Sequence, residues 1–288
     1  MIQSAQAHAA IASMGDVLGP ETLQRCVALF ESEQQALAKA MPASHVDAAY
    51  GAHARHRLDL YGAQGSAGRP APVMLFVHGG GFRLGDKGSV ANWANANVGR
   101  MAARAGFLGV VMNYRLAPDH GWPSGGEDVG AAVDWLRANV GAHGGDPGRI
   151  VLVGTSAGAV HVATYLQLRP ADRDVRAAVL LSGLYGVTGL EERDTLYFGE
   201  PIQHAERMPL EAVTATEIPL LVACAEFDPP RFQAEFLGIL KQRLERHGAM
   251  PRAYVASGHN HYSMAMHLGG SDARLADEIV SFARERCG

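Results

Sequence analysis

The residues from Arg149 to Gly158 read Arg-Ile-Val-Leu-Val-Gly-Thr-Ser-Ala-Gly. Four consecutive apolar residues, Ile150–Val153, predict a buried strand, and the small residues after them cannot continue it. A sharp turn must follow, and Ser156 lies in it between Gly154 and Gly158, in the Gly-x-Ser-x-Gly spacing of a nucleophile elbow. Glycine is needed at both flanks because a Cβ there would collide with the crowded turn or the neighbouring strand. The pattern predicts a serine whose hydroxyl stands exposed above a sheet edge.

Helical and strand-like segments alternate on either side of this turn. The residues directly after it, Ala157–Leu168, predict a mostly apolar helix whose N-terminus places positive partial charge beside Ser156. The alternation predicts an α/β fold with a mostly parallel central sheet, helices on both faces, and the loops after the strands along one edge. The other expected helices are Gly126–Asn139 and Arg231–His247, and the expected strands are Val73–Val77, Leu108–Met112, Ile150–Val153, Ala178–Leu181 and Leu220–Cys224, with Arg57–Tyr61 as an edge strand.

Two segments fall outside this alternation. Pro20–Ala40 predicts a helix, and the segment 1–45 that contains it forms either one wall of a substrate pocket or a surface helix. Residues 183–217 are too long and too rich in aromatic side chains for a simple connector, and they form either a lid or an irregular surface excursion. We expect a single domain over residues 1–288, with both segments contributing to a small cap.

Composition argues against several classes of protein. The 288 residues are 48% hydrophobic and 19% charged, and a net charge of −4 gives no reason to expect nucleic acid or an anionic membrane as a partner. The scattered cysteines Cys26, Cys224 and Cys287 favour reduced thiols and no structural zinc. The N-terminus lacks the pattern of a secretory signal, and no apolar run has the length of a membrane span. We expect a soluble cytoplasmic protein, and the composition leaves open whether it forms a homodimer.

A glycine-rich segment follows the strand expected over Val73–Val77. It reads His-Gly-Gly-Gly-Phe from His78, and three consecutive glycines are costly unless a bare backbone is required there. In acyl transfer the oxygen of the tetrahedral intermediate needs two or three N–H donors. We expect the N–H groups of Gly80, Gly81 and Ala157 to serve as these donors, and His78 to hold the loop rather than act as a base. The spacing matches neither of the phosphate-binding glycine motifs, so no nucleotide is expected.

A serine nucleophile needs a base within hydrogen-bond reach and a carboxylate that orients the base. After an elbow of this kind, the acid and then the histidine follow the serine along the chain. Asp228 comes after the strand expected over Leu220–Cys224, at the sheet edge where the acid is needed. Glu226 competes, but it lies nearer the strand, and the prolines after Asp228 fix the turn there. Asp228 is therefore the preferred acid.

Two histidines are candidates for the base. His259 and His261 both follow the strand-like Arg252–Ala256 in a loop before the final helix, and the residues alone do not separate them. One of them is expected to be a bystander. A metal site made of both with His267 is a weaker interpretation, because no carboxylate or cysteine cluster matches it. We expect no metal and no organic cofactor.

With these motifs in this order, the chain from about Val46 to its C-terminus resembles the α/β-hydrolase superfamily. More narrowly, it is similar to the hormone-sensitive-lipase-like branch of carboxylesterases and to small esterases of the feruloyl-esterase and kynurenine-formamidase type. Tyr114–Pro118 and Gly144–Pro147 are further runs that match the family. Thr155 stands where many relatives carry an acidic residue. The resemblance implies the α/β-hydrolase fold.

The resemblance also implies roles for single residues. Ser156 would be the nucleophile, Asp228 the acid and His261 the base. His261 is preferred to His259 because an aromatic residue usually follows the family's histidine, and Tyr262 follows His261 here. The oxyanion hole would be formed by Gly80, Gly81 and Ala157.

The expected activity is hydrolysis of carboxylic esters with small acyl groups, by acylation of Ser156 and hydrolysis of the acyl-enzyme. A small-molecule ester is therefore the expected partner. An amidase, arylformamidase in particular, would use the same residues on a C–N bond, and Ser182–Tyr185 resembles the formamidase and feruloyl-esterase relatives. A non-catalytic ligand-binding protein on this scaffold is a weaker interpretation, since serine, acid and histidine are all present.

Overall fold

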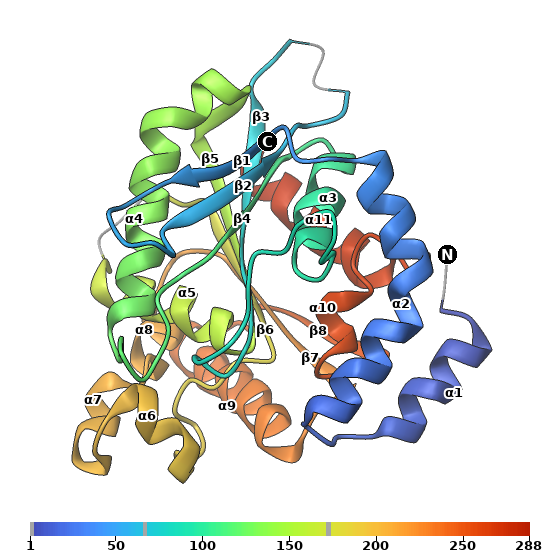
Figure 1. The fold of residues 1–288 in the computed structure, drawn as a ribbon. Coiled ribbons are helices and arrows are strands. Elements are labelled where there is room, and N and C mark those ends of the chain that lie inside the picture. Colours follow the sequence, from blue (N-terminus) through green and yellow to red (C-terminus); the bar gives the residue numbers. More distant parts are fainter. Residues whose placement is uncertain (1–2, 66–67, 171–173) are drawn as a thin grey trace.

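A sheet runs through the centre of the molecule, and the described residues contribute eight strands to it (Figure 1). The computed structural model describes residues 3–65, 68–170 and 174–288. The strand order is β1-β2-β4-β3-β5-β6-β7-β8. β1 and β2 run antiparallel to their neighbours, and the strands from β3 to β8 are parallel to one another. The strands are β1 (His45–Ala49), β2 (Arg57–Tyr61), β3 (Ala71–Val77), β4 (Leu108–Met112), β5 (Gly145–Thr155), β6 (Ala177–Leu181), β7 (Leu220–Phe227) and β8 (Arg252–Asn260).

The strands send alternate side chains into two apolar clusters, one on each face of the sheet. In β3, Val73, Leu75 and Val77 join one cluster, and Met74 and Phe76 join the other. The alternation arises because successive side chains of a strand point to opposite faces. Central parallel strands buried on both faces therefore need continuous apolar runs, which is why the expected strands contain so few polar residues.

Helices cover both clusters. One face lies under α4, α5, α8 and α9, and the other lies under α2, α3, α10 and α11 (Figure 1). Within the described ranges, no helix has both the length and the apolar character that crossing a membrane requires. The helices of the first face are α4 (Ser124–Asn139), α5 (Ala157–Leu168), α8 (Leu210–Ala215) and α9 (Pro230–His247), and those of the second are α2 (Pro20–Ala40), α3 (Ala96–Arg104), α10 (Ser263–Met266) and α11 (Arg274–Cys287).

The predicted fold class, an α/β fold with a mostly parallel sheet and helices on both faces, is confirmed. Helices α2 and α5 have the predicted bounds. The strand expected over Ile150–Val153 is longer, because β5 begins where Gly145 pairs with Ala71. The prediction that Arg57–Tyr61 is an edge strand is wrong, because β1 pairs with its outer side and forms the edge instead. The helix α1 (Ala5–Met14) is additional to the expected ones: its alanine-rich sequence carries little amphipathic pattern, and the burial of Ile11 and Met14 against the rest of the molecule was not visible in the sequence.

Of the N-terminal segment, the described residues 3–45 lie along the part of the chain that follows β8. The Gly19 N–H donates to the Tyr262 hydroxyl at 3.1 Å, and Gln34 Nε2 donates to the Leu268 carbonyl at 3.1 Å. In Figure 1, α1 and α2 accordingly stand beside α10 and β8. This segment therefore supports the loop between β8 and α10.

Residues 183–217 contain short helices rather than one irregular loop. α6 (Thr195–Phe198) and α7 (His204–Arg207) lie at the lower left of Figure 1, outside the two main helical layers. α8 belongs instead to the layer on the sheet, and its Val213 is fully buried in the main core. The part of the segment that can cover the sheet edge is therefore the part before α8. Its action as a lid stays a prediction.

Candidate active site

Ser156 stands in the turn between β5 and α5, with φ of +52° and ψ of −121°. A Cβ added to Gly154 would overlap the Gly158 carbonyl, and a Cβ on Gly158 would overlap the Val77 carbonyl. Both glycines therefore allow the turn to pass against neighbouring backbone. The Ser156 N–H donates to the Leu181 carbonyl at 2.8 Å, which ties the turn to the end of β6.

Three side chains from distant parts of the chain form a hydrogen-bonded series at the carboxyl edge of the sheet. Ser156 Oγ lies 2.9 Å from His261 Nε2, and His261 Nδ1 lies 2.7 Å from Asp228 Oδ1. Because a carboxylate oxygen accepts and does not donate, Nδ1–H donates to Asp228, and Nε2 is left to accept from the serine hydroxyl. This is the tautomer that a general base requires. Asp228 is completely buried, and His261 is 8% exposed.

Glu226, the competing acid, points away from this series. Its Oε2 accepts hydrogen bonds from the Ser257 hydroxyl at 2.8 Å and from the Gly258 N–H at 2.7 Å. The Gly258 N–H and then the Ser257 hydroxyl lower the pKa of the Glu226 carboxyl. The structure therefore places Asp228, rather than Glu226, against His261.

His259, the alternative base, is buried beneath the loop that carries His261. Its Nδ1 lies 3.1 Å from Ser263 Oγ, and its Nε2 lies 3.3 Å from Asp272 Oδ2. Its ring stacks on His267 with 3.8 Å between centroids, and burial lowers its pKa. These contacts are those of a side chain that braces the loop. Among residues 3–65, 68–170 and 174–288, no group of three His, Cys, Asp or Glu side chains is placed to hold a metal ion.

The glycine-rich segment after β3 passes directly beside the serine. A Cβ on Gly79 would come within 3.2 Å of Ser156 Cβ. Gly80 and Gly81 have φ of +134° and +58°, which favour glycine. Their N–H groups have no acceptor in the described part of the chain, and the Ala157 N–H is one of the first amides of α5, which a helix leaves unpaired. The three amides predicted to bind an oxyanion thus belong to the two segments that meet at Ser156.

His78 fixes the backbone of the glycine-rich segment through hydrogen bonds and ring stacking. Its Nδ1 donates to the Gly79 carbonyl at 2.6 Å, and its ring stacks on Tyr114 with 4.3 Å between centroids. The Tyr114 hydroxyl donates to the His78 carbonyl at 2.9 Å. Complete burial lowers the pKa of His78 to about 4, so the ring is neutral at neutral pH. A neutral, enclosed ring of this kind fits the structural role predicted for it.

An apolar cluster borders the elbow helix and the glycine-rich segment. The ring of Phe82 stacks on Tyr197 with 4.3 Å between centroids and only 4° between planes. Tyr197 is held in place because its hydroxyl accepts from the Gly125 N–H and bonds His161 Nδ1 at 3.2 Å. Leu18, from the turn between α1 and α2, packs against the same cluster. The members that residues 183–217 contribute are Leu184, Tyr197, Phe198 and Met208.

Ser182 is a further residue of this site, and no motif in the sequence indicates a role for it. Its hydroxyl donates to Asp228 Oδ2 at 2.5 Å, and the Ala225 N–H donates to the same oxygen at 2.7 Å. The available signal is a small hydroxyl residue directly after a buried strand, at the edge where the catalytic side chains gather. Such a residue is common in α/β folds, so the signal alone does not identify it.

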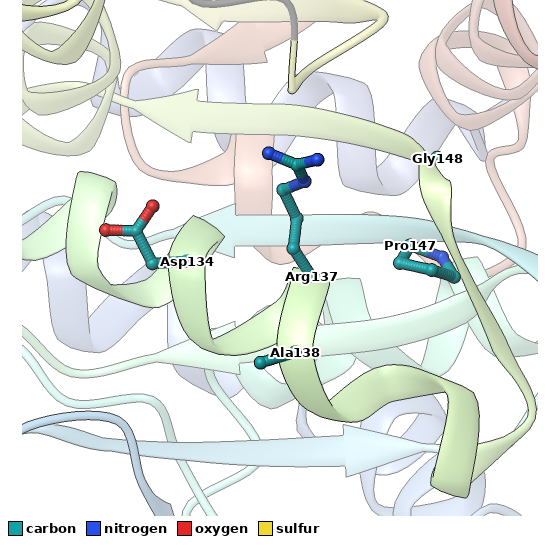
Figure 2. A pocket seen from close by; sticks show the side chains of 5 residues that line it. All are labelled: Asp134, Arg137, Ala138, Pro147 and Gly148. Atoms are coloured by element: carbon teal, nitrogen blue, oxygen red, sulfur yellow. The ribbon is translucent and has the colours of Figure 1, made fainter.

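A surface pocket of about 450 Å³ lies at the other end of β5 and takes no part in this site (Figure 2). It is lined by residues of α4 and by the first residues of β5, whereas Ser156 follows the last residue of that strand. The lining residues are Asp134, Arg137, Ala138, Pro147 and Gly148.

Comparison with known proteins identifies similar sequences. Residues 74–208 match a family model described as the alpha/beta hydrolase fold. The chain is 32% identical over 171 residues to esterase LipC of Mycobacterium tuberculosis, and the alignment covers 56% of this chain and 41% of that protein. It is 30% identical over 241 residues to esterase LipQ of the same organism, and this alignment covers 75% of this chain and 55% of that protein. The chain is also 36% identical over 133 residues to the chlorogenic acid esterase of Aspergillus niger, covering 43% of this chain and 25% of that protein. It thus spans about a quarter to just over half the length of these relatives.

Solved structures share the fold over almost the whole chain. A hyperthermophilic esterase from the archaeon Pyrobaculum calidifontis superposes with a TM-score of 0.72 at 22% identity, covering 99% of both chains. An arylesterase superposes with a TM-score of 0.67 at 19% identity, covering 100% of both chains. At these identities the likeness concerns the fold.

Proposed function

We propose that this chain, which has the α/β-hydrolase fold, is a carboxylesterase that cleaves short-chain carboxylic esters through an acyl-enzyme on Ser156. One observation carries the proposal: Ser156 Oγ, His261 and Asp228 are joined by contacts of 2.9 and 2.7 Å at one edge of the sheet. The esterases among its sequence relatives support an ester as the bond that is cleaved.

In the acylation step, His261 Nε2 takes the hydroxyl proton of Ser156 while Oγ attacks the ester carbonyl carbon. The carbonyl oxygen becomes negatively charged and accepts hydrogen bonds from the amides of Gly80, Gly81 and Ala157. The tetrahedral intermediate then breaks its bond to the alcohol oxygen, which takes the proton from His261 and leaves as the free alcohol.

In the deacylation step, His261 takes a proton from water as the water oxygen attacks the acyl carbon. The bond to Ser156 Oγ breaks, and Oγ recovers the proton from His261, which releases the carboxylic acid. In both steps the imidazolium carries its positive charge beside the Asp228 carboxylate, which orients the ring and stabilises that charge.

The apolar cluster that borders the glycine-rich segment supports a short acyl group as the preferred one. Phe82 directly follows Gly81, is 5% exposed and stacks on the ring of Tyr197. We therefore expect acetyl and butyryl esters to be cleaved faster than dodecanoyl esters.

The experiment that tests the proposal is Ser156→Ala, assayed with p-nitrophenyl acetate. We expect kcat/KM to fall on the order of ten-thousandfold, because the nucleophile is lost while the fold remains. A fluorophosphonate should label the wild-type protein and not the variant. Ser281→Ala is the matched control, since this hydroxyl contacts the exposed Glu285 on α11. Substantial residual activity of Ser156→Ala would contradict the proposal, and faster turnover of N-formylkynurenine than of p-nitrophenyl esters would contradict the choice of an ester.

A further inference from the structure

The end of β6 contacts two members of the proposed triad, Ser156 through Leu181 and Asp228 through Ser182. Ser182 directly follows β6 and is 2% exposed. Its hydroxyl donates to Asp228 Oδ2 at 2.5 Å, and its N–H donates to the Ala223 carbonyl at 2.9 Å. The carbonyl of the preceding residue, Leu181, accepts from the Ser156 N–H. One short segment therefore contacts both the nucleophile's backbone and the acid's side chain.

The backbone of Ser182 has an unusual conformation. Its φ is +48°, in the left-handed region that favours glycine and that a residue with a Cβ adopts at a cost in strain. Glycine would fit this position with less strain. A serine that accepts the strained conformation in a buried position points to a use for its side chain.

The hydroxyl is placed so that its proton goes to the carboxylate. Met264 Sδ lies 3.0 Å from Ser182 Oγ, so a weakly accepting sulfur occupies another side of the oxygen. Asp228 Oδ1 faces His261 Nδ1, and Oδ2 receives the Ser182 hydroxyl together with the Ala225 N–H. A completely buried carboxylate needs such donors on both oxygens, because water cannot supply them.

We propose that Ser182 is a positioning residue for the reaction: its hydroxyl fixes the Asp228 carboxylate with Oδ1 toward His261 and balances the carboxylate's charge as the imidazolium forms. This inference rests on the proposed function. Hydrogen bonds to ionised groups are short and strong, and the 2.5 Å contact is of this kind. The role differs from that of Asp228, since Ser182 acts on the base only through the acid.

The experiment compares Ser182→Ala with Ser182→Gly in the full chain. Both variants lack the hydroxyl, but glycine relieves the backbone strain and alanine does not. For p-nitrophenyl acetate we expect kcat to fall about ten- to hundredfold in both, with KM within about twofold, because the loss concerns proton transfer and not substrate binding. Without this donor the carboxylate's charge acts more fully on His261. The midpoint of the acidic limb of the kcat/KM profile should therefore move to higher pH by about half a unit or more.

Ser257→Ala is the matched control. It removes another serine-to-carboxylate hydrogen bond near the end of the same sheet, the 2.8 Å contact to Glu226, without touching Asp228. We expect its kcat and its pH profile to match those of the wild type. Thermal unfolding of all the variants separates a kinetic role from a loss of stability.

Three results would overturn the inference. The first is a kcat within twofold of wild type in Ser182→Gly. The second is a fall in kcat that follows the loss of thermal stability, with an unmoved pH profile. The third is loss of the folded state in both variants, since the residue would then be structural. Fluorophosphonate labelling distinguishes failure of the proposed function: an unlabelled wild-type protein would reject the esterase itself, whereas a labelled wild type with unaffected Ser182 variants would reject only this inference.

Discussion

At the scale of single residues, the candidate site is surrounded by strained backbone. Ser156, Phe82 and Ser182 have φ of +52°, +66° and +48°, in a region that few non-glycine residues adopt. Ser156 and Ser182 directly follow β5 and β6, and Phe82 ends the glycine-rich segment after β3. A backbone hydrogen bond to another segment fixes each of them: the Ser156 N–H donates to Leu181, the Ala117 N–H donates to the Phe82 carbonyl, and the Ser182 N–H donates to Ala223. Strain of this kind persists where the surroundings fix it, and it places side chains where relaxed turns would not.

The roles of the two histidines can be separated with the same substitution. His261→Asn should lower kcat for p-nitrophenyl acetate on the order of ten-thousandfold, because it removes the base between Ser156 and Asp228. His259→Asn should leave kcat within about tenfold of the wild-type value, because the Asn side chain can still reach Ser263 as Nδ1 does. It should lower the free energy of unfolding by about 1 to 3 kcal/mol, because the contact to Asp272 is lost. Steady-state kinetics and urea unfolding measure both. Equal losses of kcat in the two variants would refute the assignment of His261.

At the scale of elements, helix α9 anchors the start of the segment 183–217. Glu235 of α9 is completely buried, and its Oε2 accepts from three consecutive amides, those of Tyr185, Gly186 and Val187, at 2.9 to 3.2 Å. Its Oε1 accepts from the N–H and the hydroxyl of Thr188 at 2.8 and 2.5 Å. One carboxylate thereby replaces the hydrogen bonds that a strand or helix would otherwise give this turn.

Glu235→Gln tests this anchor. An amide presents two N–H donors to a turn that itself donates, so we expect the free energy of unfolding to fall by roughly 2 to 4 kcal/mol. KM should rise more than kcat falls, because the turn carries Leu184 of the apolar cluster and no member of the triad. Glu245→Gln, on the same helix with 63% of its side chain exposed, is the control and should change stability by less than about 0.5 kcal/mol. Equal unfolding curves for the two variants would contradict the role of Glu235.

At the scale of the whole molecule, the folded protein buries several histidines whose rings are neutral at neutral pH. Burial lowers the pKa of His78 to about 4, and burial is the main cause that lowers the pKa values of His161 and His267 to about 3. In the unfolded chain a histidine binds its proton near pH 6.5. Between that pH and the folded pKa, the unfolded state binds more protons, so folding stability is greatest above pH 6.5 and falls as the pH decreases toward 4 and then 3.

We therefore expect acid sensitivity in a range where most carboxyl groups remain ionised. The Tm should fall by roughly 5 to 15 °C between pH 7 and pH 5. His267→Asn should reduce this fall, because it removes one titrating ring that stacks on His259 while keeping a donor near the Ser263 carbonyl. Circular dichroism melting of both proteins across this range provides the measurement. An identical dependence of Tm on pH in the variant would show that His267 does not contribute.

Features that depend on near neighbours in the chain could be read from the residues alone. The apolar run Ile150–Val153, the small residues around Ser156 and the glycines after β3 predict a buried strand, a tight elbow and a bare loop, because strand, turn and glycine preferences act over a few residues. The alternation of such segments, together with the strong handedness of crossovers between parallel strands, leads to the fold class.

Contacts between distant residues were decided only when the chain folded. His261 and His259 are separated by one residue and look alike in the sequence. Yet His259, near the end of β8, is buried against Asp272, whereas His261, just after the strand, lies beside Ser156. Ser182 meets Asp228 across 46 positions of the chain. A hydrogen bond over such a distance leaves no local pattern, because the partner's side chain and backbone conformation are set by packing rather than by the residues beside it.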